Sequence, residues 1–99
     1  MTAGLDEKTA TLIRTVLKKF PAVERAVLFG SRAKGMHAAN SDIDIAFFGE
    51  IDSQLAEQIS LDLNELPLPQ KFDVQPYAGI KNPALKDHID RIGITVYER

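Results

Sequence analysis

Two aspartates separated by a single residue, Asp42 and Asp44, are the feature of this sequence best suited to chemistry. They stand in residues 41–48, whose first half alternates polar and apolar side chains as a β-strand does. In a strand both carboxylates point to one face, with Cα atoms roughly 7 Å apart, and can share cations. Because neighbouring like charges disfavour ionisation, a purely structural strand rarely carries such a pair without a compensating cation. The pair therefore predicts a site for an oxygen-preferring ion such as Mg²⁺.

A third carboxylate, Asp73, lies in another alternating segment, residues 71–77. If that strand neighbours the strand over 41–48, Asp42, Asp44 and Asp73 can hold two metal ions about 3.5–4 Å apart. Such ions activate an attacking hydroxyl and stabilise a leaving pyrophosphate in an in-line displacement, with the third acid as general base. The alternative without a functional role is that these aspartates simply face water on polar strand surfaces.

A possible phosphate cradle precedes the aspartates at Gly30 and Ser31. A strand that ends in glycine and turns into a helix at Ser31 exposes unpaired backbone N–H groups at the positive end of the helix dipole. Arg32 and Lys34 follow and are candidates for contacts with phosphate or with an acidic partner. Ser31 is also suited to be a helix N-cap, a role that is compatible with phosphate binding. The alternative for Arg32 and Lys34 is that they simply face solvent.

The periodicity predicts eight elements that must position these residues. Helices are expected over residues 6–20, 31–35, 52–66 and 83–92, and strands over 26–29, 41–48, 71–77 and 94–97. The order is that of an α/β (α+β) fold with a small, mixed four-stranded sheet packed with helices. Inward-facing residues are expected to be Ile43, Ile45 and Phe47 in the second strand, and Leu85, Ile89 and Ile92 in the last helix. The two histidines, His37 and His88, receive no role.

Composition excludes several classes of protein. With 99 residues, 44% hydrophobic and 26% charged, the chain is expected to form a single domain over residues 1–99. The net charge of −2 argues against sequence-independent nucleic-acid binding. The absence of cysteine excludes disulfides and thiolate metal sites and favours a reducing compartment. No apolar stretch is long enough to span a membrane, so we expect a cytoplasmic protein.

In combination, these motifs resemble a known family. Gly30-Ser31, then about ten residues, then Ser41-Asp42-x-Asp44, and a later isolated Asp73 are similar to the nucleotidyltransferase superfamily of DNA polymerase β. More narrowly, the motif Gly-Ser-Arg-Ala-Lys-Gly and the chain length resemble those of the minimal nucleotidyltransferases (MNT), the antitoxins of MNT/HEPN toxin–antitoxin modules. Lys34 departs from the arginine of many relatives, and it keeps the charge without the bidentate fork.

The resemblance implies an activity and a set of residue roles. Gly30 and Ser31 would hold the β- and γ-phosphates of ATP, with nucleotide contacts also from Arg32, Lys34 and Ser41. Asp42 and Asp44 would ligate two Mg²⁺ ions, and Asp73 would complete one metal site and help deprotonate the acceptor. The reaction would transfer AMP to a hydroxyl group, a tyrosine of a partner HEPN toxin being expected, and would silence that toxin.

Two alternatives remain open at the level of sequence. The protein could neutralise a HEPN ribonuclease by occlusion, without catalysis, or it could transfer the nucleotide to a small-molecule acceptor. Because so short a chain builds little of a second wall around the acceptor, a partner is expected to complete the site, either a HEPN protein encoded by an adjacent gene or a second copy of this chain.

Overall fold

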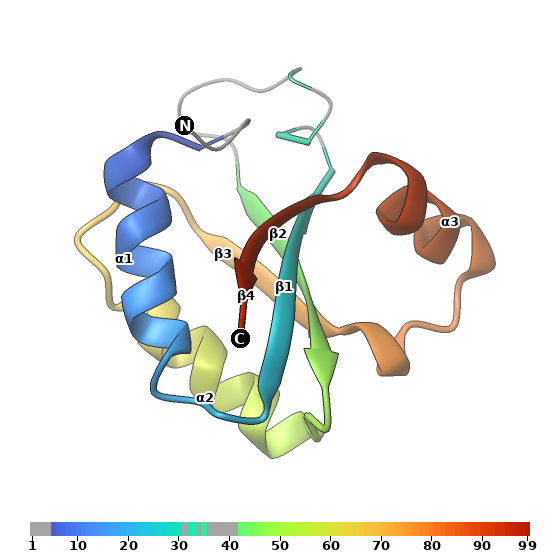
Figure 1. Ribbon diagram of the computed structural model, residues 1–99, viewed down its shortest axis with the longest axis horizontal. Helices are drawn as coiled ribbons and strands as arrows, with labels where there is room; N and C mark the ends of the chain where they lie inside the picture. The colour runs from blue at the N-terminus through green and yellow to red at the C-terminus, as the bar shows by residue number, and fades with distance from the viewer. Residues whose placement is uncertain (1–4, 31, 34, 36–41) are drawn as a thin grey trace.

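The computed structural model describes residues 5–30, 32–33, 35 and 42–99 and arranges them around one four-stranded sheet (Figure 1). The elements in chain order are α1 (Glu7–Leu17), β1 (Val23–Phe29), β2 (Ile43–Gly49), α2 (Ser53–Asn64), β3 (Phe72–Pro76), the short 3₁₀ helix η1 (Tyr77–Gly79), α3 (Pro83–Ile92) and β4 (Ile94–Glu98). The predicted α/β class with four strands is confirmed.

The sheet has the strand order β3-β2-β1-β4. β1 pairs antiparallel with both β2 and β4, whereas β2 and β3 are parallel and are connected through α2. A parallel connection needs a crossover element, and α2 supplies it. The sheet is therefore mixed, as predicted, and the strand that carries Asp73 lies directly beside the strand that carries Asp44.

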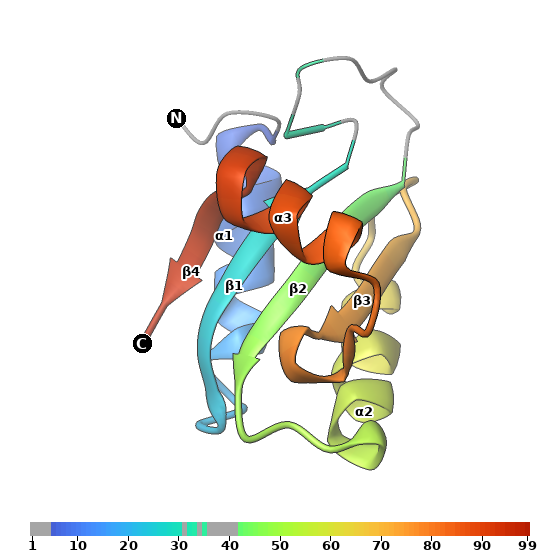
Figure 2. The ribbon, with the colours of Figure 1, turned by 90° about the vertical axis from the view of Figure 1, so that its right-hand side faces the viewer.

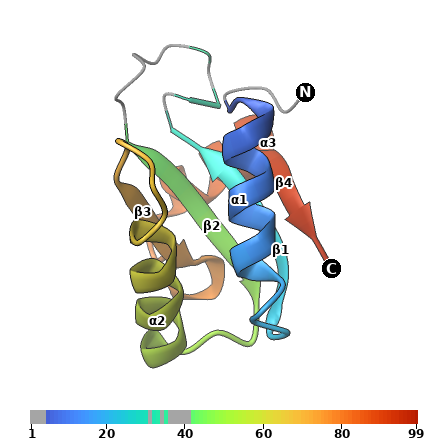
Figure 3. The same cartoon turned by 90° about the vertical axis from the view of Figure 1, so that its left-hand side faces the viewer.

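Two helices cover one face of the sheet and one helix covers the other. Figure 3 shows α1 and α2 in front of the sheet, and Figure 2 shows α3 with η1 on the opposite side. Ile43, Ile45 and Phe47, each at most 1% exposed, belong to the core beneath α1 and α2, which confirms their predicted common face. The intervening Ala46 packs in a smaller cluster with Ile89 of α3.

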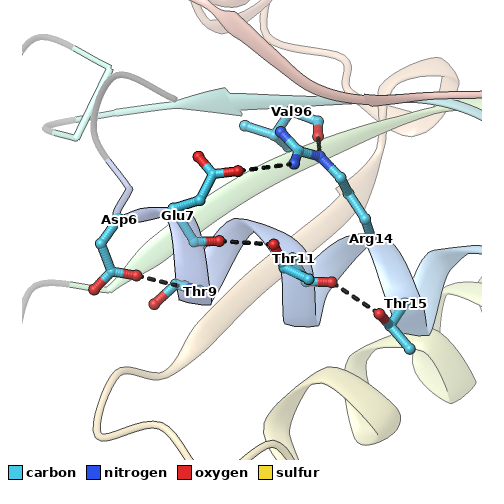
Figure 4. A network of polar contacts seen from close by, with 7 residues as sticks. All are labelled: Asp6, Glu7, Thr9, Thr11, Arg14, Thr15 and Val96. Atoms are coloured by element: carbon cyan, nitrogen blue, oxygen red, sulfur yellow. Dashed lines mark hydrogen bonds and ion pairs between the residues drawn. The ribbon is translucent and has the colours of Figure 1, made fainter. Parts of the chain in front are cut away.

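Each of the α-helices α1, α2 and α3 is capped at its start by a polar side chain. Asp6 accepts a hydrogen bond from the Thr9 N–H at 2.7 Å, Asp52 caps α2 in the same way, and Asn82 precedes Pro83 at the start of α3. Figure 4 shows this first cap together with Arg14, whose Nε donates to the Val96 carbonyl at 3.0 Å. This bond ties α1 to the edge strand β4.

Two local predictions differ from the structure. The helix expected over 31–35 is not among the described elements: Arg32 and Ala33 lie in a turn, and the Gly35 N–H donates to the Arg32 carbonyl at 3.1 Å. Gly35 has a positive φ of 74°. Ile92 was predicted to face inward but is 40% exposed, because it is the last residue of α3 and lies at the margin of the core.

No helix within the described parts of the chain is long and apolar enough to cross a membrane.

Candidate active site

The candidate residues meet in one row across the sheet, where β1 ends and where β2 and β3 begin. Phe29 of β1 is paired with Asp44 of β2, and Asp44 is paired with Asp73 of β3. Side chains at paired positions on neighbouring strands lie next to each other. The condition placed on Asp73, that its strand adjoin the strand of Asp44, is therefore met.

Gly30 follows Phe29 directly and lies against the carboxylate of Asp44. Its φ is 76°, a conformation that favours glycine, and a Cβ built on it would overlap Asp44 Oδ2. Two separate constraints thus require glycine at this position. The close approach leaves the Asp44 carboxylate directly over the main chain at the end of β1.

The three carboxylates form one region of negative charge. Asp44 is half-buried, and Asp42 and Asp73 are exposed. Burial raises the pKa of the Asp44 carboxyl group, and the negative charges of Asp73 and Asp42 raise it further. Asp44 is therefore ionised at a cost in the protein alone, and a cation bound at this edge of the sheet would relieve that cost.

The metal-binding prediction rests on the chemistry of these donors. Carboxylate oxygens suit Mg²⁺, and Asp42, Asp44 and Asp73 supply them from the edge of two adjacent strands. Across the described ranges, however, no three acidic, histidine or cysteine side chains are gathered closely enough to hold a metal ion as they stand. Asp42 and Asp73 are exposed, so other rotamers are open to them.

His88 of α3 is a contributor that sequence reasoning missed. The Gly30 N–H donates to His88 Nε2 at 2.9 Å, so this N–H group is not free, contrary to the expectation of an unpaired cradle. The His88 ring also meets the Phe29 ring edge-on, with centroids 6.2 Å apart. The two partners of the hydrogen bond are 58 positions apart in the chain, and no local pattern signals such a contact.

A second missed contributor, Asn64, fixes the strand that carries Asp73. Its Oδ1 accepts from the Phe72 N–H at 3.0 Å, and its Nδ2 donates to the Phe72 carbonyl at 3.4 Å. Asn64 ends α2, so its side chain joins the end of that helix to the first residue of β3. The residue immediately before Asp73 is thereby held through both of its main-chain polar groups.

Of the five predicted nucleotide contacts, Gly30 and Arg32 are described by the structure. Arg32 is only 6% exposed; burial lowers the pKa of its guanidinium group, and attraction to Asp6 at the start of α1 opposes that shift. Arg32 is therefore a buried charge beside a helix start, and the solvent-facing alternative is wrong. Its contact with phosphate stays a prediction. Ser31, Lys34 and Ser41 lie outside the described residues.

Comparison with known families shows to which family the chain belongs. Residues 12–99 match the family described as "Polymerase beta, Nucleotidyltransferase". The chain belongs to the polymerase beta nucleotidyltransferase family. The resemblance inferred from Gly30-Ser31 and Asp42-x-Asp44 is thus confirmed at the level of the family, and with it the nucleotidyltransferase class of enzyme.

Solved structures share the fold of this nucleotidyltransferase domain. A toxin–antitoxin crystal structure with AMP-PNP superposes with a TM-score of 0.75 at 22% identity, over 91% of this chain and 73% of that one. A tri-AMPylated HEPN toxin from Shewanella oneidensis in complex with MNT antitoxin gives 0.73 at 17%, over 96% and 74%. A candidate nucleotidyltransferase from Sulfolobus solfataricus gives 0.59 at 23%, over 93% and 79%. No curated protein matches the sequence.

Proposed function

We propose that this nucleotidyltransferase is an antitoxin that transfers AMP from ATP to a hydroxyl group, expected to be that of a tyrosine, on a partner HEPN toxin. The observation that carries the proposal is the row formed by Gly30, Asp44 and Asp73, which crosses three neighbouring strands where β1 ends and β2 and β3 begin. Two structural neighbours support the choice of substrates, since one is a toxin–antitoxin crystallised with AMP-PNP and another contains an AMPylated HEPN toxin with an MNT antitoxin.

The residues would divide the work as follows. Gly30 and Ser31 would receive the β- and γ-phosphates, assisted by Arg32, Lys34 and Ser41. The acceptor oxygen would form a bond to the α-phosphorus of ATP while the bond from that phosphorus to pyrophosphate breaks. Asp73, exposed and level with Asp44, would take the proton that the acceptor hydroxyl loses.

The carboxylates of Asp42, Asp44 and Asp73 would hold two Mg²⁺ ions. When bound, these ions would neutralise the triphosphate and stabilise the charge of the departing pyrophosphate. What the chain itself contributes is the placement of three carboxylates at the ends of adjacent strands, with Asp44 packed against a glycine whose missing Cβ leaves room for its carboxylate.

One observation favours a second candidate function. The three carboxylates are not gathered into a metal-binding group among the described residues, which suits an antitoxin that neutralises its HEPN partner by occlusion. Transfer to a small-molecule acceptor is not favoured by any described feature. Occlusion predicts that neutralisation needs neither ATP nor the aspartates.

The deciding experiment combines α-labelled ATP and Mg²⁺ with the HEPN protein of the adjacent gene. Wild-type protein, Asp44→Asn and the control Glu57→Gln are compared, the control removing an exposed carboxylate of α2. Label on the HEPN protein with wild type and the control, but not with Asp44→Asn, supports the proposal. Full neutralisation of ribonuclease activity by Asp44→Asn without ATP would establish occlusion instead.

We further propose that residues 1–99 act as one domain in the cytoplasm. A cysteine-free chain and an ATP-dependent reaction both fit a reducing, nucleotide-rich compartment. The HEPN partner, or a second copy of the chain, would complete the acceptor side of the site.

A further inference from the structure

The end of β1 is held by a side chain of α3, the helix that covers the second face of the sheet. His88 belongs to α3, which lies on the face of the sheet away from α1 and α2 (Figure 2). Its Nε2 accepts the Gly30 N–H at 2.9 Å, and its ring is half-buried against Phe29. An imidazole nitrogen can accept only when it carries no proton, so the neutral ring has its proton on Nδ1.

Gly30 is therefore restrained on two sides. Asp44 Oδ2 occupies the space where a Cβ would be, and His88 holds the N–H group. The positive φ of 76° is a conformation that glycine leaves easily when nothing holds it, because glycine has many alternatives of similar energy. A directional hydrogen bond to the peptide selects one of them.

An apolar side chain would fill the same space without this effect. The contact of α3 with β1 already includes Ile89, which is 2% exposed and packs with Val27 and Phe29. Hydrophobic anchoring of the helix therefore does not require a histidine at position 88, directly before Ile89. What the imidazole adds, and an apolar side chain cannot supply, is a hydrogen-bond acceptor for the Gly30 N–H.

We infer that His88 is a positioning residue of the nucleotidyl-transfer site: its imidazole holds the Gly30 peptide against Asp44, at the end of β1 where the proposed function places the triphosphate. This role rests on the proposed function. It gives α3 a part in positioning the site. The three aspartates of the site, Asp42, Asp44 and Asp73, lie instead on β2 and β3 or next to them.

The test compares two replacements at His88. His88→Gln keeps an acceptor at about the reach of Nε2, whereas His88→Leu keeps apolar bulk and removes the acceptor. Asp87→Asn is the matched control, since it alters only an exposed pair with Arg91 on the same helix. Loss of one such hydrogen bond corresponds to roughly a 5- to 30-fold change. We expect kcat/KM for ATP to fall by that factor in His88→Leu and to recover in His88→Gln.

Nuclear magnetic resonance provides a readout that does not depend on activity. The chain has six glycines and two histidines, so selective ¹⁵N labelling of either type gives few signals. We expect the Nδ1–H tautomer at His88 in the wild type. The Gly30 amide should be protected from hydrogen exchange in the wild type and in His88→Gln, and unprotected in His88→Leu.

Each outcome decides a separate statement. The opposite tautomer, or a Gly30 amide that does not respond to His88→Leu, would overturn the hydrogen bond and the inference with it. A Gly30 amide that loses protection while kcat/KM stays at the wild-type value would make His88 structural only. Wild-type protein that transfers no AMP to its partner would overturn the proposed function, while the amide and tautomer measurements still decide whether His88 holds Gly30.

Discussion

Replacing Asp44 by asparagine should stabilise the protein while abolishing nucleotidyl transfer. Burial, and then the charges of Asp73 and Asp42, raise the pKa of the half-buried Asp44 carboxyl group above its ordinary value of 3.8. A carboxyl group whose pKa is higher in the folded state destabilises that state when ionised. In the metal-free protein the stability should therefore fall as pH rises through the window that begins near 3.8.

The expected magnitude follows from the placement of the charges. Neighbouring strands are about 4.8 Å apart and alternate residues of one strand about 7 Å, so the repulsions of Asp44 with Asp73 and Asp42 are roughly 0.9 and 0.6 kcal/mol in water. Ions at physiological strength reduce each by about half. Asp44→Asn should then gain about 0.7 kcal/mol, which raises the melting temperature of a domain of this size by roughly 3–6 °C.

The assay is thermal unfolding followed by circular dichroism, in EDTA, between pH 7 and pH 4. The gain of the variant should shrink toward acid pH, where wild-type Asp44 takes up a proton, and shrink again in 1 M salt. Glu57→Gln, which removes a charge from the exposed face of α2, should change the melting temperature little at any pH. An asparagine variant less stable than wild type at pH 7, or a gain independent of pH, would refute this account of the site.

Three further predictions concern the same region and the core. Gly30→Ala should lower the free energy of unfolding by about 1–3 kcal/mol in urea titrations and abolish transfer, because φ is positive and the new Cβ would displace Asp44 Oδ2; unchanged transfer would contradict the close approach. Asp73→Asn should reduce AMP transfer at least about 100-fold without lowering the melting temperature, and a stable variant with normal turnover would exclude Asp73 as the base. Ile89→Ala should cost about 2–5 kcal/mol and Ile92→Ala less than about 0.5 kcal/mol; equal costs would contradict the exposure of Ile92.

Local patterns predicted the elements of this fold well because each is signalled by nearby residues. Alternation over 43–47 placed three apolar residues on one face, and all three are buried in one core. Helices predicted to start at residues 6 and 52 have Asp6 and Asp52 as their N-caps, and the helix predicted from residue 83 has Asn82 as its N-cap. Ile92 was assigned wrongly because periodicity gives the direction of a side chain and says nothing about whether another layer lies beneath the end of the helix.

Contacts between distant segments could be predicted only conditionally. The sequence suggested that Asp73 would join Asp44 if their strands were neighbours, and the parallel pairing of β2 with β3 meets that condition. Nothing in the sequence predicted that Asn64 would hold Phe72 or that His88 would accept the Gly30 N–H. Both contacts are made by side chains to main-chain groups, and neither residue type nor spacing distinguishes Asn64 and His88 from solvated side chains.

The end of β1 owes its geometry to both layers of the fold. From one face of the sheet, His88 of α3 accepts the Gly30 N–H. Arg32, two positions after Gly30 in the chain, is buried on the other side. Its charge is attracted to that of Asp6, the N-cap of α1. A glycine with positive φ is otherwise a weakly restrained point. The His88 imidazole carries no negative charge, so it restrains this glycine without adding to the repulsion among Asp42, Asp44 and Asp73.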